Sequence, residues 1–165
     1  MPASWRSSAL DRRIGPATVT RLQIEETIHI AAPPDIVWKF LVDPRSWQHW
    51  WPGCRDAETR DRKTLHDGSS FVLAVHLGWL TLRFNAQVEA ATAPRALIWT
   101  ASGAGVTGRH AFYLDAKPNG TFVREQESFS GVGLLLFRLL RFDAASRRMF
   151  QQNLRGLKRI AERSA

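Results

Sequence analysis

The chain lacks several features that define common protein classes. Its single cysteine, Cys54, excludes an internal disulfide and a zinc site built from several cysteines. No apolar run reaches the ~18 residues that a membrane-spanning helix requires. The amino terminus, residues 1–13, carries arginines and no apolar block, so it does not resemble a secretory signal. We therefore expect a cytoplasmic protein.

Motifs for nucleotide, metal or covalent chemistry are also missing. A phosphate-binding loop needs a glycine-rich turn between a strand and a helix, followed by lysine, whereas the glycine-rich segment 103–108 lies between two predicted strands. No two histidines have the spacing that places both on one helix face, as in zinc proteases; they are His29, His49, His66, His76 and His110. We expect neither a cofactor nor a metal.

Composition and charge favour one globular domain. The chain has 165 residues, of which 44% are hydrophobic and 23% charged, values that exclude a fully disordered protein. The net charge of +8 is concentrated in residues 1–21 and 132–165. Basic ends can attract nucleic acid, anionic lipid or an acidic partner, but a solvated helix face is the plainer interpretation. We expect residues 1–21 to be an irregular leader and 22–163 to be one domain.

Alternating apolar and polar residues predict an antiparallel sheet. The first strand, 22–30, places four apolar residues and Glu26 on one face. Asn119-Gly120 predicts a hairpin turn, because this pair readily adopts positive φ. Further strands are predicted over 54–62, 70–77, 80–88, 97–101, 106–114 and 121–130. In the last of these, neither face is plainly apolar.

Helical periodicity predicts two short helices, 34–42 and 45–51, and one long helix at the carboxyl end. Asp43-Pro44 separates the short helices, because the residue before proline disfavours helical geometry. We expect four tryptophans to brace the short helices against the end of the long one: Trp38, Trp47, Trp50 and Trp51. The long helix has an apolar stripe formed by Phe150, Leu154, Leu157 and Ile160.

The apolar segment 134–142 allows two interpretations. It could form the buried first turns of the long helix. Alternatively, it is a partly exposed gate beside Arg138, Arg141, Arg147 and Arg148, an arrangement that would suit docking on an anionic bilayer.

The order of elements predicts an α+β fold in which a seven-stranded curved antiparallel sheet grips the long helix, with the two short helices between strands 1 and 2. The chain resembles the START/Bet v 1-like (SRPBCC) helix-grip superfamily, in particular its polyketide cyclase/dehydrase and lipid-transport-like members. The segments that carry this resemblance are 28–33, Val37-Trp38, 47–53, 121–131 and 153–158, together with Glu162. The resemblance covers residues 22–163. It implies the strand order 1-7-6-5-4-3-2 and a central cavity for an apolar or amphipathic small molecule.

Three polar residues lie where the apolar pattern predicts burial: Glu26, His110 and Asn153. A carboxylate without a partner in apolar surroundings costs several kcal/mol or becomes neutral, so Glu26 should have a partner or a ligand. In an enzyme, Glu26 and His110 would be the acid and base. The alternative is that both are bonded to backbone or water. We expect the ligand cavity to be formed by Leu73, Val75, Leu82, Phe84, Trp99, Phe112, Phe150, Asn153 and Leu154.

Three functions remain open. The first is binding of a hydrophobic or amphipathic small molecule, such as a lipid, quinone or polyketide, for transport or presentation. The second is a polyketide cyclase or dehydratase activity, which the resemblance makes reasonable. The third is association with a ribosome or a membrane surface through the basic ends, although nucleic acid is not the expected partner. The sequence leaves both monomer and homodimer open.

Overall fold

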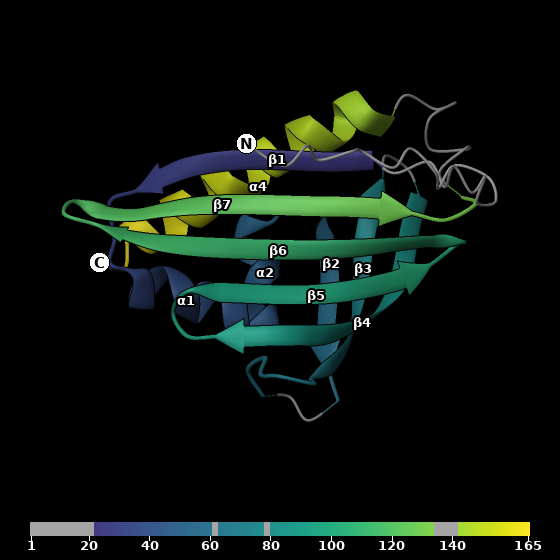
Figure 1. Ribbon diagram of the computed structural model, residues 1–165, viewed down its shortest axis with the longest axis horizontal. Helices are drawn as coiled ribbons and strands as arrows, with labels where there is room; N and C mark the ends of the chain where they lie inside the picture. The colour runs from purple at the N-terminus through teal and green to yellow at the C-terminus, as the bar shows by residue number, and fades with distance from the viewer. Residues whose placement is uncertain (1–21, 61–62, 78–79, 134–141) are drawn as a thin grey trace, which may run out of the picture.

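The computed structural model describes residues 22–60, 63–77, 80–133 and 142–165. Its seven strands form one antiparallel sheet in the order β1-β7-β6-β5-β4-β3-β2 (Figure 1), which confirms the predicted fold class and strand order. The strands are β1 (Leu22–Ile30), β2 (Cys54–Thr59), β3 (Ser70–Leu77), β4 (Leu80–Thr92), β5 (Ala96–Gly103), β6 (Val106–Lys117) and β7 (Gly120–Ser130).

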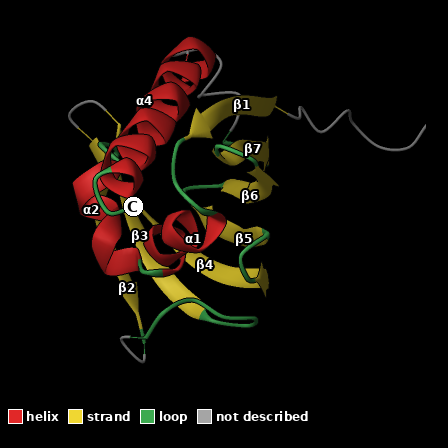
Figure 2. Ribbon diagram, turned by 90° about the vertical axis from the view of Figure 1, so that its left-hand side faces the viewer, coloured by secondary structure: helices red, strands yellow, loops and turns green. Residues whose placement is uncertain are grey.

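The helices lie on the concave side of this sheet (Figure 2). Between β1 and β2 the chain forms α1 (Pro34–Val42), η1 (Pro44–Ser46) and α2 (Trp47–Trp50), as the sequence predicts. The long helix α4 (Phe142–Glu162) crosses the sheet, packing mainly against β1. The segment 134–141, with Arg138 and Arg141 of the proposed gate, lies outside the described residues. None of the described helices is both long and apolar enough to cross a membrane.

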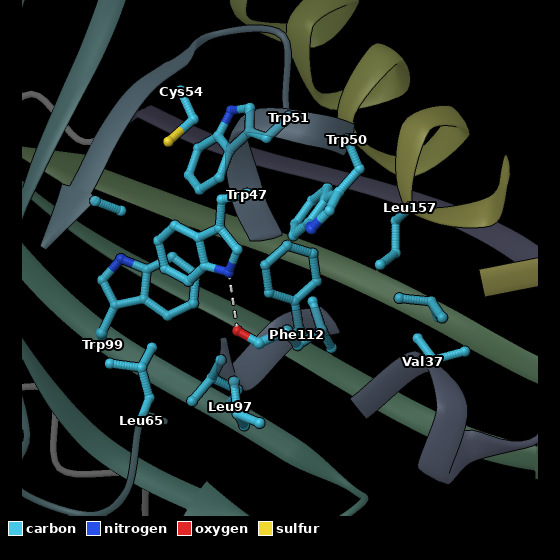
Figure 3. Packing of buried hydrophobic residues seen from close by; sticks show 14 of the residues in the cluster. Val37, Trp47, Trp50, Trp51, Cys54, Leu65, Leu97, Trp99, Phe112 and Leu157 are labelled. Carbon is cyan, nitrogen blue, oxygen red and sulfur yellow. Dashed lines mark hydrogen bonds between the residues drawn. The ribbon is translucent and has the colours of Figure 1, made fainter. Parts of the chain in front are cut away.

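Aromatic side chains fill one end of the space between sheet and helices (Figure 3). The ring of Trp47 stacks against Trp99 at 5.3 Å and meets the edge of Phe71 at 5.6 Å. Its Nε1 donates to the carbonyl oxygen of Leu41 over 3.0 Å, so burial leaves no unpaired donor there. Trp50 packs against Phe112 at 6.4 Å. This end of the interior is therefore closely packed by aromatic side chains.

Helix α4 reaches α2 through a position that only glycine can occupy. A Cβ added at Gly156 would lie 1.8 Å from the carbonyl oxygen of Trp50. The backbones of the two helices are thus in direct contact, and the tryptophans of α2 are pressed into the core from one side by α4 and from the other by the sheet. Trp50 and Trp47 are fully buried, whereas Trp38 of α1 is half-buried.

Polar bonds fasten the carboxyl end of α4 to the connection after β1. Glu162 Oε1 accepts the backbone N–H of Ala31 at 2.7 Å and lies 2.9 Å from Lys158 Nζ. Lys158 Nζ also donates to the carbonyl oxygen of His29 over 2.7 Å. The hydroxyl of Thr121 donates to the carbonyl oxygen of Ala32. These bonds fix the direction of α4, and so decide which of its residues face the sheet.

Candidate functional site

Strand register brings the polar residues of the interior together on β1, β7 and β6, the three strands at one edge of the sheet. His110 on β6 stands opposite Glu127 on β7 and opposite Trp99 on β5. Glu125, two residues before Glu127, stands opposite Glu26 on β1. Residues two apart on a strand share a face, so β7 directs both Glu125 and Glu127 inward. A row of ionisable groups therefore crosses an otherwise apolar face.

His110 is buried between aromatic rings and two carboxyl groups. Its ring stacks against Trp99 at 4.5 Å and against Phe150 of α4 at 5.5 Å. Nδ1 lies 3.6 Å from Glu127 Oε2, and Nε2 lies 3.0 Å from Glu125 Oε1 without hydrogen-bond geometry. Burial lowers the pKa of His110, and the Glu127 carboxylate partly offsets this effect. The ring is therefore neutral at pH 7.

Glu127 combines burial with access to the interior space. Its side chain keeps 15% of its surface exposed. Burial is the main cause that raises its pKa to about 7. Of the neighbouring groups, His110 lowers this pKa and Glu125 raises it. A carboxyl group with a pKa near neutrality can both give and take a proton at physiological pH. Gly108 makes room for this group, because a Cβ there would lie 3.0 Å from Glu127 Oε1.

Glu125 is fully buried behind His110, and its only hydrogen bond among the described residues is a long one from Asn153 Nδ2 at 3.5 Å. Burial raises its pKa well above the usual value; the Asn153 amide lowers it and Glu26 raises it. Within the part of the chain that the structure describes, Glu125 Oε2, Asn153 Oδ1 and His110 Nε2 have no hydrogen-bond partner. An ionised carboxylate would be poorly compensated here, so burial favours the neutral acid form of Glu125.

A cavity of about 70 Å³ lies next to His110 and Glu127, between the sheet and Met149 of α4. This volume is smaller than the ~300–1,000 Å³ usual for ligand pockets, and smaller than a cavity of about 150 Å³ that admits benzene. The cavity residues are Trp51, Leu73, Val75, Phe84, Trp99, Ala101, Val106, Gly108, His110, Glu127, Phe129 and Met149. Phe84, Phe129 and Met149 are only partly buried. A larger guest must displace some of these three side chains.

The structure places the expected cavity residues in two groups. Leu73, Val75, Phe84 and Trp99 line the cavity, together with His110. The remaining expected cavity residues are not part of its wall: Leu82, Phe112, Phe150, Asn153 and Leu154. Leu82 is half-buried on β4, and the other four are buried in the interior. Phe112 packs against Trp50 and Trp99, and Phe150, Asn153 and Leu154 lie on the buried face of α4.

Glu26 lies apart from the cavity. Its side chain is 20% exposed, its Oε1 lies 3.9 Å from Arg147 Nη1, and its Oε2 accepts a hydrogen bond from Gln151 Nε2 at 3.4 Å. Glu26 therefore has the polar partners that its position demands, on α4. The structure groups His110 with Glu125 and Glu127, and Glu26 lies beyond Glu125 on the neighbouring strand.

Sequence reasoning missed Glu125 and Glu127. Their signal was the strand 121–130, in which neither face is plainly apolar. The inward face of β7 carries Thr121, Val123, Glu125 and Glu127, so the unclear alternation came from carboxyl groups at buried positions. A carboxyl group on the inward face of an interior strand indicates a functional site. Burying such a group costs free energy, and packing does not recover that cost.

Comparison with known proteins assigns the family. No curated protein matches the chain. The Zhui aromatase/cyclase from Streptomyces sp. R1128 shares the fold, with a TM-score of 0.74 and 17% identity over 87% of this chain and 95% of that chain. Protein jhp0584 from Helicobacter pylori has a TM-score of 0.71 and 18% identity over 98% of this chain and 99% of that chain. The di-domain ARO/CYC StfQ from the steffimycin biosynthetic pathway has a TM-score of 0.68 and 12% identity over 86% of this chain and 49% of that chain.

Structural similarity at such low sequence identity establishes only the fold. The sequence itself carries the assignment, because residues 21–162 match the profile of the family described as "Polyketide cyclase / dehydrase and lipid transport". That match spans nearly the whole domain from β1 to the end of α4. The chain therefore belongs to the polyketide cyclase/dehydrase and lipid-transport family.

Proposed function

We propose that this protein binds a hydrophobic or amphipathic small molecule, of the lipid, quinone or polyketide kind, in the cavity between the sheet and α4. The observation that carries the proposal is the composition of the cavity wall, in which aromatic and aliphatic side chains surround two polar groups, His110 and Glu127. Small-molecule pockets commonly combine an apolar wall with a few convergent polar groups. Membership of a family that includes cyclases and lipid-transport proteins supports the same function.

The size of the cavity limits how the guest enters. About 70 Å³ does not hold a multi-ring molecule, and Trp47, Trp50 and Phe112 already fill the neighbouring interior. A flat guest can enter by displacing Met149, because an unbranched thioether side chain adopts new rotamers easily. It would then lie between the sheet and α4, with its ring system near Trp99 and Trp51.

Binding can be tested with a simple aromatic probe and a pair of matched variants. Isothermal titration calorimetry with 2-naphthol should show saturable binding to the protein. Ala101→Phe fills the cavity from β5 and should abolish binding, whereas Ser102→Phe points to the opposite face of the same strand and should not. Native mass spectrometry of gently purified protein should also show a co-purified ligand. The proposal would be contradicted if the probe did not bind and no ligand co-purified with the protein.

A second candidate function is acid–base catalysis of the cyclase or dehydratase type. Two cavity residues favour it: Glu127, whose pKa of about 7 suits a general base, and His110, which is 3.6 Å away. Glu127 would remove a proton from a carbon next to a ligand carbonyl, leaving an enolate, and would later return that proton. Of the catalytic pair expected from the sequence, His110 keeps its place in this proposal and Glu127 takes the place of Glu26.

Deuterium exchange into 2-tetralone, followed by proton NMR in heavy water, tests this chemistry without knowledge of the natural substrate. The protein should accelerate loss of the signal from the protons next to the carbonyl, and Glu127→Gln should remove most of that acceleration. Glu58→Gln, an exposed residue on β2, provides the control. Acceleration that is unchanged in Glu127→Gln would eliminate the role of this carboxyl group.

We also propose that the protein docks on an anionic membrane surface through basic residues at the start of α4. Arg147 and Arg148 are exposed near the start of α4, which supports it. Cosedimentation with phosphatidylserine vesicles should then weaken as salt increases, and the double variant Arg147→Ser, Arg148→Ser should weaken it further. A cytoplasmic location also belongs to the proposal, because the only cysteine, Cys54, is a buried free thiol.

A further inference from the structure

The cavity has acidic and neutral polar groups but no basic side chain among the described residues that line it. Its ionisable groups are Glu127 and His110, and burial keeps His110 neutral. Behind the wall lie the buried Glu125 and, beyond it, Glu26. The basic partner of this row, Arg147, faces Glu26 at 3.9 Å and is itself 60% exposed. No positive charge in the described residues is therefore built into the cavity wall.

This arrangement has opposite consequences for two kinds of ligand. A carboxylate beside ionised Glu127 would place two negative charges in an apolar space without a compensating cation, which is costly. A neutral hydroxyl group would instead donate a charge-assisted hydrogen bond to the Glu127 carboxylate. Trp51, also in the wall, has a buried Nε1–H that finds no acceptor among the residues the structure describes, and a hydroxyl oxygen could accept from such a donor as well.

We propose that the cavity selects neutral ligands that carry a hydroxyl donor, such as a phenol or an enol, and rejects ligands that carry a carboxylate. This inference rests on the proposed binding function and adds the chemical class of the ligand's polar group. Glu127 accepts the hydroxyl hydrogen, and the aromatic wall around Trp99 holds the ring. A free fatty acid is therefore excluded, although its hydrocarbon chain would suit an apolar cavity.

The selection depends on pH through Glu127. The groups that face this part of the interior are His110 from β6, Glu125 from β7, Glu26 from β1, and Arg147 and Asn153 from α4. Burial favours the neutral forms of Glu125 and His110, whereas Glu127, with a pKa of about 7, is the cavity group that changes charge near neutrality. Below its pKa of about 7, Glu127 becomes neutral and the penalty on a carboxylate ligand falls.

Three probes with the same naphthalene ring test the inference by calorimetry: 2-naphthol, 2-methoxynaphthalene and 2-naphthoate. The methyl ether can accept a hydrogen bond but not donate one, and the carboxylate adds a negative charge. At about pH 8, where Glu127 is ionised, 2-naphthol should bind at least tenfold more tightly than either of the others. At about pH 5.5 the difference between 2-naphthol and 2-naphthoate should shrink.

Glu127→Gln should remove the pH dependence and reduce the preference for 2-naphthol over 2-naphthoate, while Glu58→Gln should change neither. If the Glu127 variant does not fold, the pH series on the unaltered protein still decides. Equal affinity for all three probes, or tighter binding of 2-naphthoate at about pH 8, would overturn the inference and leave the binding function standing. Failure of every probe would also overturn it, and a co-purified ligand in the mass spectrum would then show whether the binding function survives.

Discussion

The interior has two ends that differ in composition: a packed tryptophan cluster beneath α2 and a polar cluster around His110. Beneath α2, the tryptophans pack ring against ring, and both Trp47 and Trp50 donate their indole N–H to a protein oxygen. Around His110, three buried polar atoms have no hydrogen-bond partner in the described ranges, and a cavity remains beside them. Both ends lie on the same face of the sheet, one beneath α2 and the other beneath α4. The difference is in which side chains the strands and α4 direct inward.

This contrast separates stability from function. The tryptophan end removes a large apolar surface from water and satisfies its polar groups, so it stabilises the fold. The polar end buries Glu125 and leaves space that side chains could have filled, and both features reduce the stability of the folded state. A cluster that is costly in this way is a candidate for binding or chemistry, since packing gains nothing from it.

The largest expected effect is at the packed end. Trp47→Ala should lower the free energy of unfolding by about 3–5 kcal/mol, because it removes a fully buried ring that touches Trp99 and Phe71. Urea denaturation followed by circular dichroism measures this change. Trp38→Ala removes a half-buried ring on α1 and should cost less. Equal losses in the two variants would show that the tryptophan end is not the main source of stability.

The second effect concerns the contact between α2 and α4. Gly156→Ala places a Cβ against the carbonyl oxygen of Trp50, so the helices must separate. We expect a loss of about 1–3 kcal/mol, although alanine is intrinsically the better helix former. Thermal unfolding provides the measurement. Gln152→Ala, at an exposed position on the same helix, should leave the melting temperature nearly unchanged.

The third prediction tests the cost of the polar end through pH. Because burial raises the pKa of Glu127 from 4.5 to about 7, the folded state holds a proton that the unfolded state releases in this interval. The stability linked to this group is complete below about pH 4.5 and is lost as the pH rises through about 7, an effect on the order of 3 kcal/mol. Glu127→Gln should therefore become more stable relative to the unaltered protein as the pH rises. If the difference in unfolding free energy between Glu127→Gln and the unaltered protein stayed constant across this pH range, the prediction would be wrong.

The smallest expected effect is at the fastening of α4. Glu162→Gln weakens the interaction with the backbone of Ala31 and with Lys158, at a partly exposed site where such interactions are worth about 0.5 kcal/mol. Because the Ala31 bond and Lys158 lower the pKa of Glu162, the contribution of this group is present above about pH 4.5 and is lost as the pH falls. Unfolding curves at high and low salt should show that the loss shrinks with screening.

Local pattern was sufficient for most of the fold. Alternation and turn residues together predicted all seven strands, although the alternation in 121–130 was unclear, and Asn119-Gly120 lies at the β6–β7 turn, where Gly120 has a φ of 135°. Some boundaries differ, because strands continue as long as a neighbour supplies hydrogen bonds. Thus β2 ends at Thr59 rather than at residue 62, and β4 extends to Thr92. The sequence pattern alone carries no information on where a partner strand stops.

The site was less accessible to such reasoning. His110 stood out because it interrupts an apolar alternation, but its partners Glu125 and Glu127 are 15 and 17 residues away and become neighbours only through the β6–β7 register. Asn153 meets Glu125 across 28 residues because α4 is fixed over the sheet at its far end by Glu162 and Lys158. Neither contact can be derived from periodicity, since periodicity assigns a face and not a neighbour.

By itself, the sequence determined the elements of this protein, their order and the side of each strand that turns away from water, because these follow from the local spacing of apolar residues. Only the tertiary structure decided which buried groups meet and where space remains. Those outcomes depend on register and on the placement of one helix, and both are set by contacts between residues far apart in the chain.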